Sequence, residues 1–153
     1  IKIDTFLSGM VEEPKSTYQV KSGVPVYDIE ATAGDLEWNG DMPESITGYI
    51  SLPSFRECVA FLYLRGDSMY SILKSGDMIG LIPVEDTSII QYGNIYLVVT
   101  TDNQRMVKFI RKGDNDGEII LRSKNKDYDD IILPVSKIRK LFRVKGPIRD
   151  DWQ

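Results

Sequence analysis

The sequence contains no histidine, which removes the commonest general base of acyl-transfer enzymes. Ser-His-Asp and Cys-His catalysis both need an imidazole, and catalytic zinc sites usually take histidine ligands. If this chain cuts an amide bond, its base must therefore be Lys, Asp, Glu or Tyr. No metal and no cofactor is expected. A catalytic site in this chain would therefore consist of a nucleophile paired with one of these bases.

Cysteine, excess basic charge and long apolar runs are scarce as well. Cys58 is the one cysteine and lies in the apolar run 58–62, so we expect a buried thiol, and a disulfide within the chain is impossible. The 19 basic and 23 acidic residues give a net charge of −4, which makes these residues alone a poor partner for nucleic-acid phosphates. No apolar run approaches the roughly 18 residues that cross a bilayer, and no signal peptide opens the chain. We expect a cytoplasmic protein with no membrane contact.

Short β-prone runs separated by turn residues dominate the chain from Val24 onward. They predict a mostly β domain of strongly bent antiparallel sheets over residues 24–148, between a linker at 1–23 and a tail at 149–153. One short helix is expected at 68–74. The expected strands cover residues 24–29, 48–52, 59–65, 77–83, 94–101, 105–112, 117–122 and 138–145.

Ser68 is the candidate nucleophile. It follows Gly66 and Asp67 directly after the apolar run 59–64, and glycine permits a sharp turn there. At the start of a short helix, unpaired N–H groups around Asp67 and Met69 could receive an oxyanion. The alternative is that Ser68 only caps the turn.

Lys108 is the candidate base. Strand periodicity places it on one face with Met106 and Ile110, and Val107 and Phe109 on the other. Burial between apolar neighbours would lower the lysine pKa and leave a neutral amine able to take the Ser68 proton. The alternative is an ordinary lysine that extends into solvent from a half-exposed strand.

The segments GDSMYSILKSGDMIGLIPVED (66–86) and YGNIYLVVTTDNQRMVKFIRK (92–112) resemble the self-cleaving domains of LexA, UmuD and phage repressors. That family has a G-x-S-M turn, a short helix, a G-D turn into a strand and a lysine centred in a later apolar strand. The resemblance implies the LexA/signal-peptidase-like fold, with Ser68 as nucleophile and Lys108 as base. GEIILRSKNKDYDDIIL (117–133) is similar to the next segment, although Ser123 stands where the family pattern has proline.

The resemblance also implies a cleavage site. The family cuts an Ala–Gly or Cys–Gly bond upstream of its nucleophile, and here Ala33–Gly34 has that position. Small residues suit a segment that bends into an active site, although an ordinary loop would have the same composition.

Residues 3–10 are similar to the end of a phage-type helix-turn-helix domain, which implies a missing N-terminal DNA-binding domain before Ile1. The implied protein is a dimeric repressor of the phage or SOS type that binds operator DNA. Contact with a RecA–single-stranded DNA filament would trigger its self-cleavage. The alternatives are a UmuD-like polymerase accessory protein, a signal-peptidase-like enzyme acting in trans and a catalytically silent dimerisation module.

Overall fold

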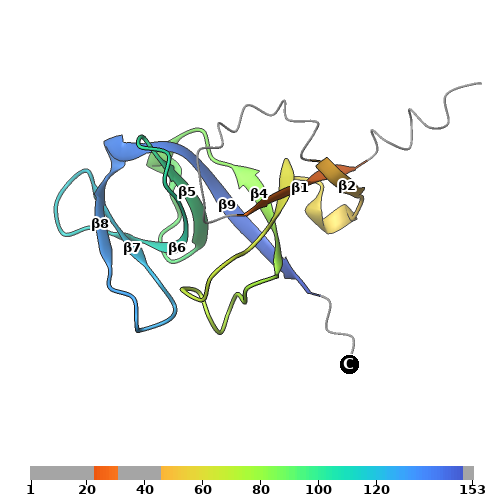
Figure 1. Ribbon diagram of the computed structural model, residues 1–153. Helices are drawn as coiled ribbons and strands as arrows, with labels where there is room; N and C mark the ends of the chain where they lie inside the picture. The colour runs from red at the N-terminus through yellow and green to blue at the C-terminus, as the bar shows by residue number, and fades with distance from the viewer. Residues whose placement is uncertain (1–22, 31–45, 150–153) are drawn as a thin grey trace, which may run out of the picture.

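The computed structural model describes residues 23–30 and 46–149 and consists mainly of β-strands (Figure 1). The strands are β1 (Val24–Glu30), β2 (Ile46–Ile50), β3 (Ala60–Tyr63), β4 (Met78–Pro83), β5 (Ile95–Thr100), β6 (Arg105–Lys112), β7 (Glu118–Arg122), β8 (Ile131–Pro134) and β9 (Ile138–Ile148). The helical elements in these ranges are three 3₁₀ turns, η2 (Pro53–Phe55), η3 (Thr87–Ile89) and η4 (Val135–Lys137). The predicted mostly β fold is confirmed.

The strands form one sheet in the order β2-β1-β3-β4-β9-β5-β6-β7-β8. The long strand β9 joins its two halves, because β9 pairs with β4 on one side and with β5 on the other (Figure 1). Strands β1–β4 form the first half and β5–β8 the second. Side chains pack into two apolar clusters, one containing Leu62, Ile79 and Leu97, the other Tyr96 and Ile110.

One strand pair departs from the predicted antiparallel arrangement. Strands β1 and β3 are parallel, with Val26 beside Phe61 and Glu30 beside Tyr63. Parallel neighbours need a long connection between them, and here β2 and η2 lie in that connection. The sheet is therefore mixed, and the chain leaves β1 and β3 at the same end of the sheet.

The short apolar segment β8 was not among the expected strands. It pairs with β7, with Ile132 opposite Ile120, and forms one edge of the sheet. Ile131 and Ile132 are both exposed, so the segment lacks the inward and outward alternation that identifies a strand. Residues 1–22, which hold nearly all of the predicted linker, lie outside the described residues.

Candidate active site

Ser68 lies on a tight turn just after β3. Gly66 has a φ of +89°, the left-handed conformation that glycine adopts without strain, so the sequence prediction of a sharp turn here is confirmed. Ser68 is partly exposed, whereas the side chains of Met69 and Leu73 are each 1% exposed and belong to the first apolar cluster. These two anchors fix the turn to the core and leave the serine near the surface.

The helix predicted at 68–74 is absent, and this segment consists of turns. Two backbone hydrogen bonds form in it, donated by the N–H groups of Tyr70 and Leu73. The next N–H group, of Lys74, donates instead to the Asp77 carboxylate at 2.7 Å. Nucleating a helix is costly for so short a segment, and the side-chain acceptor offers the backbone an alternative to a further helical turn.

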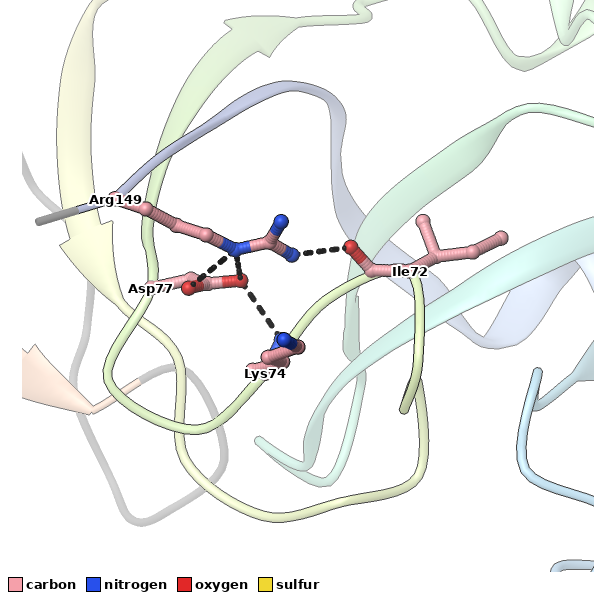
Figure 2. Close-up of polar contacts among 4 residues, drawn as sticks. All are labelled: Ile72, Lys74, Asp77 and Arg149. Atoms are coloured by element: carbon pink, nitrogen blue, oxygen red, sulfur yellow. Dashed lines mark hydrogen bonds and ion pairs between the residues drawn. The ribbon is translucent and has the colours of Figure 1, made fainter. Parts of the chain in front are cut away.

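An ion pair between Asp77 and Arg149 ties the loop after Ser68 to the end of β9 (Figure 2). The Arg149 Nε group donates to both oxygens of the buried Asp77 carboxylate, at 3.0 and 3.1 Å. Arg149 also donates from its terminal nitrogen to the carbonyl of Ile72 at 2.7 Å. The loop that follows Ser68 is thus joined to the residue after β9, although the two are far apart in sequence.

Lys108 is buried in β6, which lies between β5 and β7. Its exposed fraction is 8%, and Tyr96 is its partner across the strand pair. Met106 and Ile110 both pack with the second apolar cluster, as the strand periodicity predicted. Burial lowers the pKa of the Lys108 amine, since the apolar surroundings disfavour the ammonium form.

The polar partner of Lys108 is Ser123, directly after β7. The Lys108 Nζ atom donates a hydrogen bond of 2.8 Å to the Ser123 Oγ atom, and Ser123 is 9% exposed. The ring of Tyr128 covers the same amine, with 5.3 Å between Nζ and the ring centroid. The amine therefore has one hydroxyl and one aromatic neighbour in an apolar setting.

The segment 123–128 contacts the serine turn as well as the lysine. The backbone N–H of Asn125 donates to the Ser68 carbonyl at 2.9 Å, and its side-chain amide donates to the Asp67 carbonyl at 3.1 Å. The Tyr128 hydroxyl donates to the Asp67 carboxylate at 2.5 Å, and that carboxylate raises the pKa of Tyr128. One short segment thus contacts both predicted catalytic residues.

Ser68 and Lys108 themselves share no hydrogen bond within residues 23–30 and 46–149. In the same ranges, no acceptor is bonded to the backbone N–H of Ser68 or of Met69, so both donors are open. The predicted cleavage site at Ala33 and Gly34 lies outside the described residues.

Sequence reasoning missed three site residues, namely Ser123, Asn125 and Tyr128. A signal existed for Ser123, which departs from the proline of the family pattern at a position where a hydroxyl can act as a partner for the lysine. The contacts of Asn125 and Tyr128 depend on how the loop after β7 folds over the serine turn. No local pattern indicates that contact.

A mostly β domain with a turn-borne serine and a buried lysine of lowered pKa has the residue types of a serine hydrolase that works without histidine. The family model described as Peptidase S24-like matches residues 14–146, and the chain belongs to this family of self-cleaving LexA, UmuD and phage-repressor domains. A comparison with curated proteins found no match. In the described part of the chain, no helix has the length and apolar character needed to span a membrane.

Proposed function

We propose that this chain is the self-cleaving and dimerising C-terminal part of a cytoplasmic transcriptional repressor of the phage or SOS type. Ser68 and Lys108 form its catalytic dyad, and Ala33–Gly34 is the bond that it cuts. The observation that carries the proposal is the burial of Lys108 in a chain of the Peptidase S24-like family. A lysine acts as a general base only when it is neutral, and burial is what favours the neutral form.

The proposed reaction has two steps. In the first, the Lys108 amine takes the hydroxyl proton of Ser68, and the Ser68 oxygen bonds to the carbonyl carbon of Ala33. The bond to the Gly34 nitrogen then breaks, and the Lys108 ammonium returns its proton to that leaving amine. In the second step, water loses a proton to Lys108 and attacks the ester, which releases the Ala33 carboxylate and restores the Ser68 hydroxyl.

In both steps a negative charge develops on the carbonyl oxygen of Ala33, and backbone N–H groups of the turn that carries Ser68 can stabilise it. We assign the open backbone N–H of Met69, in the turn shaped by Asp67, as the main support of the oxyanion. Removing one such donor from a hydrolase typically slows the reaction by about 10²–10³-fold. Because these donors are backbone groups on a turn anchored in the core, they need little reorganisation when the charge appears.

The parallel pair β1–β3 supports cutting within the chain. Glu30 at the end of β1 lies beside Tyr63 at the end of β3, and both strands leave the sheet in the same direction. Ala33 follows Glu30 by three residues, which can span at most about 11 Å. Ser68 follows Tyr63 by five residues, so the serine turn and the chain that leads to the proposed cleavage site both continue from the same end of the sheet.

The wider role as a repressor rests on the family resemblance. It implies a homodimer that binds operator DNA through an N-terminal helix-turn-helix domain, with a RecA–single-stranded DNA filament as the trigger. Cutting at Ala33–Gly34 would separate the DNA-binding part from the dimerising part, and operator affinity would fall because the two half-site contacts lose their tether.

One observation favours a second candidate, a catalytically silent dimerisation module. Lys108 is hydrogen-bonded to Ser123, and no hydrogen bond in the described ranges connects it with Ser68. A silent module would keep the fold and the buried lysine but would never cut its own chain.

The test is to incubate the purified 153-residue chain at alkaline pH and measure masses over time. We expect products of 33 and 120 residues from the wild-type chain and none from Ser68→Ala or Lys108→Ala. Ser71→Ala and Lys112→Ala are matched controls, because both residues are exposed, and they should cut like wild type. If the Ser68→Ala variant still gives the two products, the dyad is wrong; an intact wild-type chain would favour the silent module.

A further inference from the structure

We infer that Ser123 is a positioning residue, whose hydroxyl holds the Lys108 amine in place for proton exchange with Ser68. This inference rests on the proposed self-cleavage and adds a third side chain to that site. Ser123 would touch neither the scissile bond nor the nucleophile, and it would act only through the lysine.

The pairing of β6 with β7 brings the two side chains together. Phe109 lies opposite Arg122 and Ile110 opposite Leu121, so the same register continued by one residue sets Lys108 opposite Ser123. Directly opposite residues on one sheet face have Cβ atoms about 5 Å apart. The 2.8 Å hydrogen bond from Nζ to Oγ therefore follows from the sheet itself.

The face that the pair shares is otherwise apolar. Ile110 and Leu121 are each 0% exposed and pack in the second apolar cluster beside Lys108 and Ser123. A buried amine loses its hydration, and an unpaired polar group in such a place costs free energy. Ser123 supplies the one hydrogen bond that the side-chain amine of Lys108 makes with a described residue.

Few ionisable groups face Lys108 from the elements around it. Tyr96 lies opposite on β5, but its hydroxyl accepts the Gln91 N–H at 2.9 Å. Tyr128 faces the amine with its ring, and its hydroxyl is directed to Asp67. Burial lowers the pKa of the Lys108 amine, and the Ser123 hydroxyl is the one described group that is hydrogen-bonded to it.

Two consequences distinguish a positioning role from general support of the fold. First, a hydroxyl that accepts a hydrogen bond stabilises the ammonium more than the neutral amine, so its removal lowers the pKa of Lys108 further. Second, lysine has a long flexible stem, and an amine without its tether spends less time where Ser68 can use it. The pH midpoint of cutting should fall, and the maximal rate should fall as well.

The experiment compares the rate of self-cleavage against pH for wild type, Ser123→Ala and Ser123→Thr. We expect Ser123→Ala to lower the alkaline plateau by about tenfold to a hundredfold and to move the midpoint to lower pH. Threonine keeps the hydroxyl and should restore the midpoint. Ser136→Ala, at an exposed serine in η4, is the matched control and should keep both values.

A second measurement does not need cutting. The pKa of Lys108 is followed by NMR in the Ser68→Ala background, with Ser123 and again with Ser123→Ala, and with Ser123→Gly if the alanine variant does not fold. A lower pKa without the hydroxyl supports the inference, and an unchanged pKa overturns it.

The outcomes also separate the inference from the proposed function. An unchanged midpoint and plateau in Ser123→Ala would overturn the positioning role and leave the dyad intact. Persistent cutting in Ser68→Ala, together with complete loss in Ser123→Ala, would overturn both, since Ser123 would then be the nucleophile.

Discussion

The two residues of the proposed dyad come from opposite halves of the sheet and are held in different ways. Ser68 lies on a loop of the β1–β4 half, partly exposed, and its position depends on contacts of that loop, among them the hydrogen bond that its own carbonyl accepts from Asn125. Lys108 lies within a strand of the β5–β8 half at 8% exposure, and its position follows from strand pairing. The nucleophile is thus positioned by loop contacts. The base is positioned by strand pairing, and its burial in the core lowers its pKa.

Because Ser68 and Lys108 are held in different ways, substitutions near each of them should affect different properties of the cleavage reaction. Changes in the core around β6 should alter the proton affinity of the base and therefore the pH dependence of cutting. Changes in the loop contacts should alter how often Ser68 is in place, which affects the rate at every pH alike. Segment 123–128 connects the two parts of the site, because it contacts both Ser68 and Lys108.

The largest effect should come from Lys108→Arg, which keeps a positive charge on β6 but removes the base. A guanidinium does not lose its proton in proteins, so cutting should fall by at least about a thousandfold at every pH. Mass spectrometry of alkaline incubations measures this loss. Lys112→Arg, an exposed change on the same strand, is the control and should cut at the wild-type rate. Cutting by Lys108→Arg at a rate close to wild type would show that residue 108 is not the base.

A smaller effect should appear in stability when the ion pair behind the serine turn is broken. Asp77→Asn leaves Arg149 with a neutral partner in a mostly buried site and should lower the free energy of unfolding by about 2–3 kcal/mol. Asp130→Asn breaks the exposed pair with Arg122 and should cost less than about 1 kcal/mol.

Urea unfolding of the two variants measures both changes. Equal losses for Asp77→Asn and Asp130→Asn would show that the contact to Arg149 does not hold the loop to β9 more firmly than a surface pair would.

The smallest effect should come from Asn125→Ala, which removes the side-chain hydrogen bond to the Asp67 carbonyl. The backbone bond from residue 125 to Ser68 is retained, so we expect cutting to slow by only about tenfold. The midpoint of the pH profile should stay unchanged, in contrast to the shift expected for Ser123→Ala. Asn115→Ala, in a turn before β7, is the matched control. A shifted midpoint in Asn125→Ala would show that loop and core contacts are not separable.

The sequence predicted those parts of the site that depend on local pattern. Alternation along residues 106–110 indicated a lysine facing the core, and that lysine is buried. Gly66 before Ser68 indicated a sharp turn, and its positive φ confirms it. Both features depend on residues a few positions apart, which is the range over which strand periodicity and turn chemistry operate.

What the sequence could not predict depends on contacts between distant segments. The parallel pairing of β1 with β3 joins residues more than 30 positions apart, and only the completed sheet decides it. Strand β8 was missed because its four residues, Ile131–Pro134, do not alternate between apolar and polar side chains and end in a proline. The turns after Ser68 replace the expected helix because the Asp77 side chain binds the Lys74 N–H, a choice that helical propensity alone does not reveal.

The most direct test of the account is the rate of self-cleavage of the wild-type chain measured across pH. Below the pKa of Lys108 only the rare neutral amine reacts, so the rate should rise about tenfold per pH unit and then level off. Because burial lowers that pKa, the midpoint should lie below the value of about 10.4 of a free lysine. A rate that is flat with pH, or a midpoint at or above that value, would contradict a buried lysine as the base.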